Sequence, residues 1–370
     1  MRRGVYQPIR QRVAHFDFEP HPMSVPTILN LRPGDWVEVR SAEEILATLD
    51  DQGSLDGLVL MPEMLDYCGR RLQVAHRADK TCDTIDLSGM LRMHNTVHLK
   101  GARCSGAAHG GCQAACLLFW KEAWLRPVSR QPKLSAHQEP SVLPETAKSA
   151  GHDLDWLDRQ TTRLTGNGHE SGEIVYRCQA TELKQAGAPI GWWYPMQYLR
   201  DVGTNGVSLT HLLYTLGLFV YNRTMLKLGR PQYPDVAGKL KRTPKEVLDL
   251  EVGEWVVVKD WKDISTSLDT AGKNRGMTFE AEMLPYCGKC YRVSQRVDRL
   301  VDERTGRMKQ MGSVGIILEE VICASAYRTP CPRANLLYWR EIWLRRATPE
   351  EIPVEPESAE TCPLLELTHS

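Results

Sequence analysis

The chain has 370 residues, of which 42% are hydrophobic and 25% are charged, so two or three compact units are expected and global disorder is excluded. Its 46 Lys and Arg residues balance 46 Asp and Glu residues, which removes the net positive field that favours nucleic-acid binding. No apolar run reaches the roughly 18 residues of a membrane span, and no signal peptide is recognisable. We therefore expect a cytoplasmic protein without a membrane span, in which the clustered members of its 11 cysteines bind metal rather than form disulfides.

A long internal repeat organises the chain. Residues 34–77 and 253–296 align without a gap at an offset of 219 and share 17 identical residues in 44 positions. The match resumes at the same offset in the blocks 104–126 and 323–345. We expect metal-binding repeat one at 31–126, a flexible linker at 127–153, a helical middle segment at 154–248, metal-binding repeat two at 249–347 and a disordered tail at 348–370.

Strand signals dominate each repeat. Residues 36–40 and 255–259 are rich in Val and follow a Gly turn, and alternating apolar and polar residues follow in both copies. The final blocks, LLFWKEAWLR and LLYWREIWLR, fit both helical and strand spacing, and we slightly favour a short helix. Several short strands per repeat predict a mainly β fold with some α structure. We expect two SH3-like small barrels, each stapled by a Cys metal site and joined by the helical segment.

The cysteines of the second repeat have the spacing of a metal site. Cys287 and Cys290 form a CxxC motif on a Gly turn, and Cys323 and Cys331 follow. Four thiolates suit a closed, tetrahedral and therefore structural zinc site. An iron–sulfur cluster and ordinary buried cysteines are the alternatives.

The first repeat keeps three of these four positions, as Cys68, Cys104 and Cys112. Arg71 stands where the second repeat has Cys290, so one ligand is missing. Three nearby residues can replace it, and we rank Cys116 first, His109 second and Cys82 third. Two interpretations remain open: a simple migration of one ligand, or a functional copy with an exchangeable coordination position for water or substrate.

Other repeated residues have simpler interpretations. Glu63 and Glu282 can orient a metal ligand, but we favour surface carboxylates. The paired tryptophans Trp120 and Trp124, with Trp339 and Trp343, can stack on bases or sugars, but recurrence in both copies favours core positions. No common nucleotide-binding, zinc-protease, serine-hydrolase or deaminase motif is present.

The chain resembles an uncharacterised bacterial family of tandem-repeat, Cys-rich proteins. The resemblance is carried by EMLxYCG, by WWYPMQYLRD, by the hairpin Asp302–Gly306 and by the block from Cys331 to Leu344. Members are often encoded near genes for polysaccharide or specialised-metabolite biosynthesis, so the resemblance implies a biosynthetic context and no particular activity.

These observations predict a zinc-binding accessory or binding protein of a bacterial biosynthetic pathway, with two zinc ions that are mainly structural. Its partner would be a protein or carrier of that pathway. The first alternative is a metalloenzyme of specialised metabolism, with an open zinc or iron site in repeat one and a small-molecule substrate. The second is a nucleic-acid-binding protein, which the balanced charge disfavours.

Overall fold

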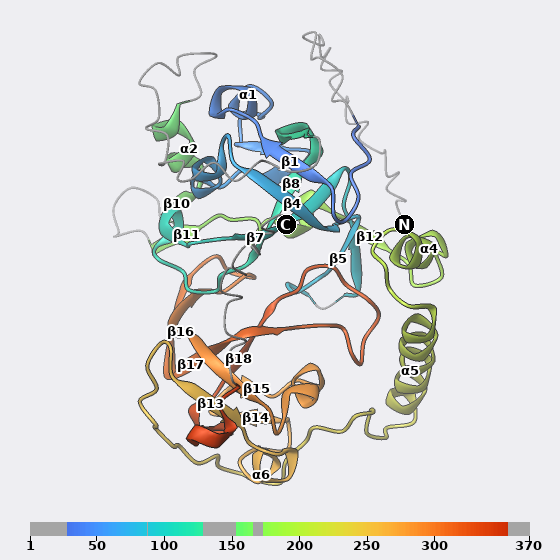
Figure 1. Cartoon of the computed structure of the whole chain (residues 1–370), viewed down its shortest axis with the longest axis vertical. Coiled ribbons are helices and arrows are strands. Elements are labelled where there is room, and N and C mark those ends of the chain that lie inside the picture. The colour runs from blue at the N-terminus through green and yellow to red at the C-terminus, as the bar shows by residue number, and fades with distance from the viewer. Residues whose placement is uncertain (1–27, 87, 129–152, 166–172, 354–370) are drawn as a thin grey trace, which may run out of the picture.

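The computed structural model of the chain describes residues 28–86, 88–128, 153–165 and 173–353. Two curled antiparallel sheets lie one above the other, the upper one from the first repeat and the lower one from the second (Figure 1). The mainly β fold with some α structure is confirmed. Most of the predicted linker, 127–153, and of the predicted tail, 348–370, lies outside the described residues.

The first sheet has the strand order β8-β7-β4-β1-β9. Alternation places Val37 and Val39 of β1 in the core while their neighbours face outward. The elements of this half are β1 (Trp36–Val39), α1 (Ala42–Leu46), β2 (Ser54–Leu55), β3 (Leu58–Val59), the 3-10 helix η1 (Pro62–Tyr67), β4 (Arg71–Arg77), β5 (Lys80–Cys82), β6 (Met90–Arg92), β7 (Thr96–Arg103), η2 (Ala107–His109), β8 (Leu117–Lys121), η3 (Glu122–Trp124) and β9 (Leu125–Pro127).

The second sheet has the corresponding order, β18-β17-β16-β13-β19. From its first strand to η4 each element begins 219 positions after its counterpart, and the matching resumes at β18. Between these blocks, β16 and β17 form one long hairpin where the first half has four shorter strands. The elements are β13 (Trp255–Val258), α6 (Trp261–Ser265), β14 (Lys273–Asn274), β15 (Met277–Thr278), η4 (Ala281–Tyr286), β16 (Cys290–Val301), β17 (Met308–Ile322), β18 (Leu336–Trp339), η5 (Glu341–Trp343), β19 (Leu344–Arg346) and η6 (Pro349–Glu351).

The repeated tryptophan blocks form a strand, a single 3-10 turn and a second strand, so the preference for a short helix is wrong. The edge of the neighbouring strand supplies backbone partners that a helix would not use. All four tryptophans of these blocks are fully buried, as expected of core positions. The indoles of Trp124 and Trp343 donate to Thr48 and Ser267, respectively, at 3.0 Å in each half.

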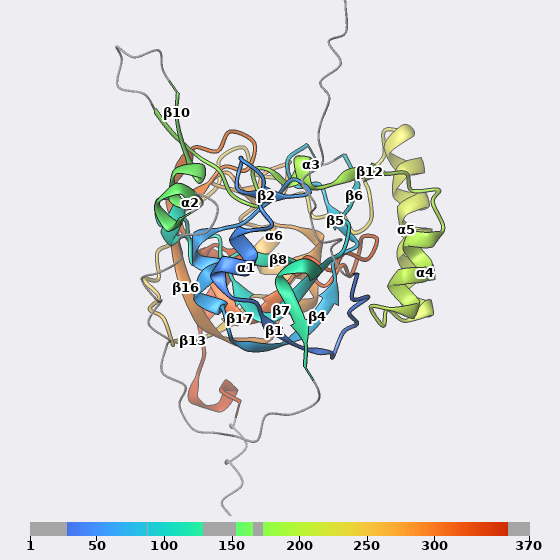
Figure 2. The ribbon, with the colours of Figure 1, turned by 90° about the horizontal axis from the view of Figure 1, so that it is seen from above.

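The middle segment, 154–248, contains strands as well as helices. Its elements are α2 (Leu154–Gln160), β10 (Thr162–Thr165), β11 (Glu173–Tyr176), α3 (Leu183–Ala186), β12 (Ala188–Ile190), α4 (Met196–Gly203) and α5 (Leu209–Lys227). Strand β12 pairs with β6, and Leu157 and Leu183 are buried in the core of the first repeat. The Gln179 side chain bonds both backbone groups of Phe119, at 2.9 Å each. The first part of the segment therefore completes the first repeat, while α4 and α5 lie at one edge of the molecule (Figure 2).

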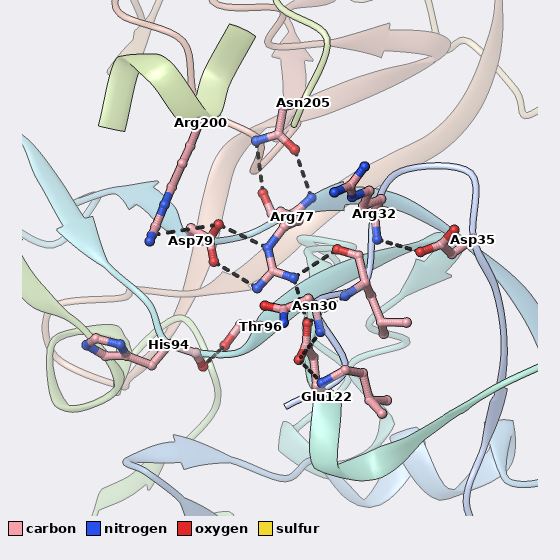
Figure 3. Close-up of polar contacts among 12 residues, drawn as sticks. Asn30, Arg32, Asp35, Arg77, Asp79, His94, Thr96, Glu122, Arg200 and Asn205 are labelled. Atoms are coloured by element: carbon pink, nitrogen blue, oxygen red, sulfur yellow. Dashed lines mark hydrogen bonds and ion pairs between the residues drawn. The ribbon is translucent and has the colours of Figure 1, made fainter. Parts of the chain in front are cut away.

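A buried arginine joins three parts of the first half (Figure 3). The Arg77 guanidinium donates to Glu122 at 2.6 Å and pairs with Asp79 at 3.0 Å. The Glu122 carboxylate also accepts the backbone N–H groups of residues 29–31, and the side chain of Asn205, after α4, bonds the Arg77 backbone. Arg296 and Glu341 occupy the equivalent positions in the second half, 3.9 Å apart. This arrangement fixes the chain entering the first sheet and ties the α4–α5 unit to it.

The two halves meet in an interface with approximate two-fold character. The backbone N–H of Cys82 donates to the Cys331 sulfur at 3.3 Å, and the N–H of Val301 donates to the Cys112 sulfur at 3.2 Å. The two contacts are equivalent, because Val301 lies 219 positions after Cys82 and Cys331 lies 219 positions after Cys112. The Arg103 guanidinium likewise donates to the carbonyls of residues 115 and 334. Equivalent loops therefore face each other across this interface.

We expect the ion pair between Lys80 and Asp201 to hold α4 against strand β5. The pair is almost fully buried, with an Nζ–Oδ2 distance of 2.5 Å. Asp201→Asn should lower the free energy of unfolding by about 3–5 kcal/mol, because it leaves the buried ammonium without a counter-charge. Urea denaturation measures this loss. The double variant Lys80→Met/Asp201→Leu should recover most of the stability, and a single-variant cost below about 1 kcal/mol would contradict this account.

The buried imidazole of His98 should make the protein less stable in acid. Burial lowers the pKa of His98 from 6.5 to about 3, and its Nδ1–H donates to the Leu118 carbonyl. Between these pH values the unfolded chain binds one more proton at this site, so the free energy of unfolding falls by about 1.4 kcal/mol for each unit of decreasing pH. Ile317 holds the equivalent position in the second half. His98→Ile should therefore fold and show a shallower pH dependence in urea denaturation; an unchanged slope would contradict the assignment.

Candidate metal centre

Three metal-binding side chains meet in the first repeat: Glu63, Cys104 and His109. Glu63 lies on η1, Cys104 follows β7, and His109 ends η2. Gly106 allows the loop to fold back at this point, since it has a φ of 75° and a Cβ there would lie 1.9 Å from the Cys112 carbonyl oxygen. The tight loop brings the imidazole, five residues after the thiol, back beside it. Among the described residues, this is the one group of three or more such side chains with mutually close donor atoms.

The donor atoms of these three side chains lie close enough together to share one ion. The Cys104 sulfur lies 3.2 Å from Glu63 Oε1 and 3.5 Å from His109 Nε2, and His109 Nδ1 lies 3.6 Å from the same carboxylate oxygen. An imidazole binds one ion through a single ring nitrogen, and with one donor atom taken from each residue the three atoms lie within 4.8 Å of one another. A thiol, an imidazole nitrogen and a carboxylate are also the ligand types that zinc takes in proteins. The group can therefore hold one metal ion through three protein ligands.

The site is buried and its polar atoms are not fully satisfied. His109 is 2% exposed and Glu63 is 7% exposed. Glu63 Oε2 and His109 Nδ1 have no hydrogen-bond partner within the part of the chain that the structure describes. Burial lowers the pKa of His109 and raises the pKa of Cys104, which the Glu63 carboxylate raises further. Without a cation this arrangement leaves one carboxylate oxygen of Glu63 buried without a partner among the described residues, which is costly.

In the second repeat a guanidinium lies beside the equivalent buried glutamate. The equivalent residues are Glu282, Cys323 and Arg328, so arginine stands in place of His109. The Glu282 carboxylate accepts the N–H groups of residues 326 and 327, at 2.5 and 2.9 Å, and lies 3.4 Å from Arg328 Nε. The Arg328 guanidinium, which is half exposed and also donates to Glu280 at 2.7 Å, thus places a fixed positive charge beside this glutamate. The first repeat has a neutral imidazole at that position and can receive a positive ion.

The other predicted ligands of the first repeat lie outside the group. Cys68 follows η1 directly, and burial and Asp66 raise its pKa to about 11. The Cys112 sulfur accepts the Val301 N–H instead. Cys116, which we rank first as the fourth ligand, accepts the backbone N–H of Cys104 with its backbone carbonyl. Its side chain lines a small pocket beside the group, together with Cys112 and Cys178.

Cys82 and the four cysteines of the second repeat are also placed elsewhere. Cys287 lies near Asp260, Cys290 begins β16 near Glu351, and Cys323 lies near Glu282. Cys331 lies against Cys82 in the interface between the halves. These cysteines do not form a four-thiolate group in the described structure. Cys290 is the first residue of β16, whereas the loop between β17 and β18 places Cys331 against Cys82 of the other half.

Two residues of the site were not recognised as such from the sequence. Glu63 is a ligand candidate rather than a surface carboxylate, and the EMLxYCG motif in both copies is the signal that points to it. Cys178 lies in the middle segment, outside both repeats, and nothing in its sequence neighbourhood predicts its position in the pocket beside Cys116. His109, which we rank second, is the extra ligand type that the structure brings into the group.

Comparison with known proteins adds no family assignment. Neither a protein-family model nor a curated protein matches the chain. In the described part of the chain, no helix combines the length and the apolar character that crossing a membrane requires. The chemistry of the site therefore rests on its own geometry.

Metal binding at this group should weaken as the pH falls. An ion must displace the proton of Cys104, whose pKa burial raises, so affinity should fall about tenfold for each unit of decreasing pH. Competition with a chromophoric chelator between pH 6 and 8 measures this slope. Cys104→Ser should abolish binding, whereas Cys68→Ser should leave it unchanged. A pH-independent affinity, or loss of the ion in the Cys68 variant, would contradict the ligand set.

Proposed function

We propose that this chain is a zinc-binding accessory or binding protein, in which one structural zinc ion completes the first repeat. The observation that carries the proposal is the exchange of His109 for Arg328 at equivalent positions, each beside a buried glutamate. Where the second repeat neutralises its glutamate with a guanidinium, the first has a neutral imidazole and a thiol, which together with the glutamate are ligands of zinc. Because the Arg328 guanidinium has a structural role in the second repeat, we assign a structural role to the zinc ion in the first.

The donor set favours zinc over the iron alternatives. Thiolate and imidazole ligands suit Zn²⁺, and two negative ligands, Glu63 and Cys104, balance its charge. An iron–sulfur cluster is ordinarily held by four cysteines, and this group has one. We propose one zinc ion rather than two, because Arg328 already occupies the cation position of the second repeat. When bound, the ion would tie η1, the end of β7 and η2 together.

The binding role rests on the surface of α4 and α5. Along this unit Leu199, Leu209 and Leu213 are each exposed by more than half, and Trp193, just before α4, is 74% exposed. Apolar surface of this extent is typical of a site that contacts another molecule. In this proposal the two repeats are small SH3-like barrels that carry the unit, and its partner is a protein or carrier. The biosynthetic context comes from the resemblance of the motif blocks alone.

A metalloenzyme is the second candidate, and one observation favours it. The group supplies three protein ligands, which leaves a fourth tetrahedral position. A small pocket lined by Cys116, Cys178 and Gln179 adjoins Cys104 and His109. An open zinc ion can polarise a carbonyl or lower the pKa of bound water. The near-complete burial of His109 and Glu63 restricts such chemistry to a very small substrate.

Replacing His109 with the residue of the other repeat tests the structural role. His109→Arg should yield a folded protein without zinc, whose thermal midpoint lies within a few degrees of the zinc-loaded wild type, because a guanidinium again neutralises Glu63. His109→Ala should lose both the zinc and the stability. Zinc content by elemental analysis and thermal unfolding by circular dichroism are the measurements.

The matched control is Arg328→Ala in the second repeat. It removes the cation beside Glu282 and should destabilise the protein without changing the zinc content. If His109→Arg is as unstable as His109→Ala, charge compensation is not the role of the ion. If His109→Arg is stable but abolishes a zinc-dependent turnover of the wild type, the metalloenzyme is the correct alternative.

A further inference from the structure

Two thiols face each other across the interface between the halves. Cys82 ends strand β5 of the first half, and Cys331 lies in the loop between β17 and β18 of the second, 249 positions later. The Cys331 sulfur accepts the Cys82 backbone N–H at 3.3 Å, and the Cys82 thiol donates to the same sulfur. Both cysteines are free and half-buried. Neither belongs to the Glu63–Cys104–His109 group.

The approximate two-fold character of the interface shows what distinguishes this pair. On the other side of the interface the equivalent contact joins Val301 to Cys112, at 3.2 Å. In each contact a loop cysteine, Cys331 or Cys112, accepts a backbone N–H with its sulfur. This hydrogen bond is therefore part of the packing between the halves. Only on the Cys82 side does the donating residue carry a thiol of its own. The second sulfur is not needed for the packing, because valine fills the equivalent position.

The surroundings of the pair suit oxidation. Both cysteines line a cavity between the halves that also borders Thr84, so a small oxidant can reach them. The Arg333 guanidinium is nearby and donates to the Cys82 carbonyl at 3.5 Å. The hydrogen bond from Cys82 lowers the pKa of Cys331 to about 7, whereas the pKa of Cys82 is raised. One sulfur is thus suited to attack and its neighbour to resolve the product.

We propose that Cys82 and Cys331 are a modification site, at which a small peroxide forms a reversible disulfide that locks the two halves together. The Cys331 thiolate attacks one peroxide oxygen, breaking the O–O bond and releasing water from hydrogen peroxide, to give a sulfenic acid. The Cys82 thiol then displaces hydroxide from that sulfur, and a second water leaves. Two thiols and one peroxide become one disulfide and two waters, and a small thiol reductant reverses the change. The proposal is independent of the role of zinc.

The test uses the reduced full-length protein, loaded with zinc and treated with one to ten equivalents of hydrogen peroxide. Tryptic peptides are mapped by mass spectrometry without reduction. The expected result is a loss of two free thiols, one linkage between the peptides of Cys82 and Cys331, and unchanged zinc content. The oxidised protein should migrate faster in non-reducing denaturing electrophoresis, because the linkage closes a long loop, and should unfold at a higher temperature until reductant is added.

Two variants complete the test. Cys82→Val copies the residue at the equivalent position and should fold, bind zinc and fail to form the intramolecular linkage. Cys112→Ser alters the opposite side of the interface and should still form it. Linkage of other cysteines in the wild type, or no loss of thiols at ten equivalents, would overturn the proposal. An unaltered thermal midpoint after complete Cys82–Cys331 linkage would show that the bond does not lock the halves.

Discussion

The need of a buried carboxylate for a positive partner governs the candidate site. Glu63 and Glu282 stand at equivalent positions on equivalent 3-10 helices, and both are almost completely buried. The second half meets this need with Arg328 and two backbone N–H groups. The first half offers instead an imidazole that burial keeps neutral and a thiol whose proton an ion can displace. The same backbone thus presents a fixed cation in one copy and a place for a metal ion in the other.

The sheets make this comparison possible because they hold both copies in the same geometry. A single exchange between equivalent positions of the two halves can therefore change the chemistry of a site without changing the backbone around it. The exchange of His109 for Arg328 separates a candidate metal site from an ion pair. The exchange of Cys82 for Val301 separates a pair of facing thiols from an ordinary packing contact. Single exchanges at equivalent positions are therefore sufficient to explain both differences between the halves.

Much of the architecture could be predicted from the sequence, because alternating patterns and the 219-residue offset mark the strands of both halves. The tryptophan blocks could not be assigned, since their spacing fits a helix as well as a strand, and the pairing of β8 with β7 decides between them. Cys104 and His109 were identified as candidate ligands, but the cysteine spacing also predicted a four-thiolate site in the second half. Spacing shows which residues are near in sequence, whereas the direction of β16 and of the following loop separates Cys290 from Cys331. Cys178 joins the pocket only through the folding of the middle segment onto the first repeat.

The most direct test is the anomalous scattering of zinc in crystals of the protein purified without oxygen. The account predicts one zinc peak per chain, in the first repeat, with one sulfur, one nitrogen and one carboxylate oxygen as protein ligands from Cys104, His109 and Glu63. It also predicts no peak beside Glu282 and Arg328. A peak surrounded by the sulfurs of Cys287, Cys290, Cys323 and Cys331, or an imidazole of His109 with no ion beside it, would contradict the account.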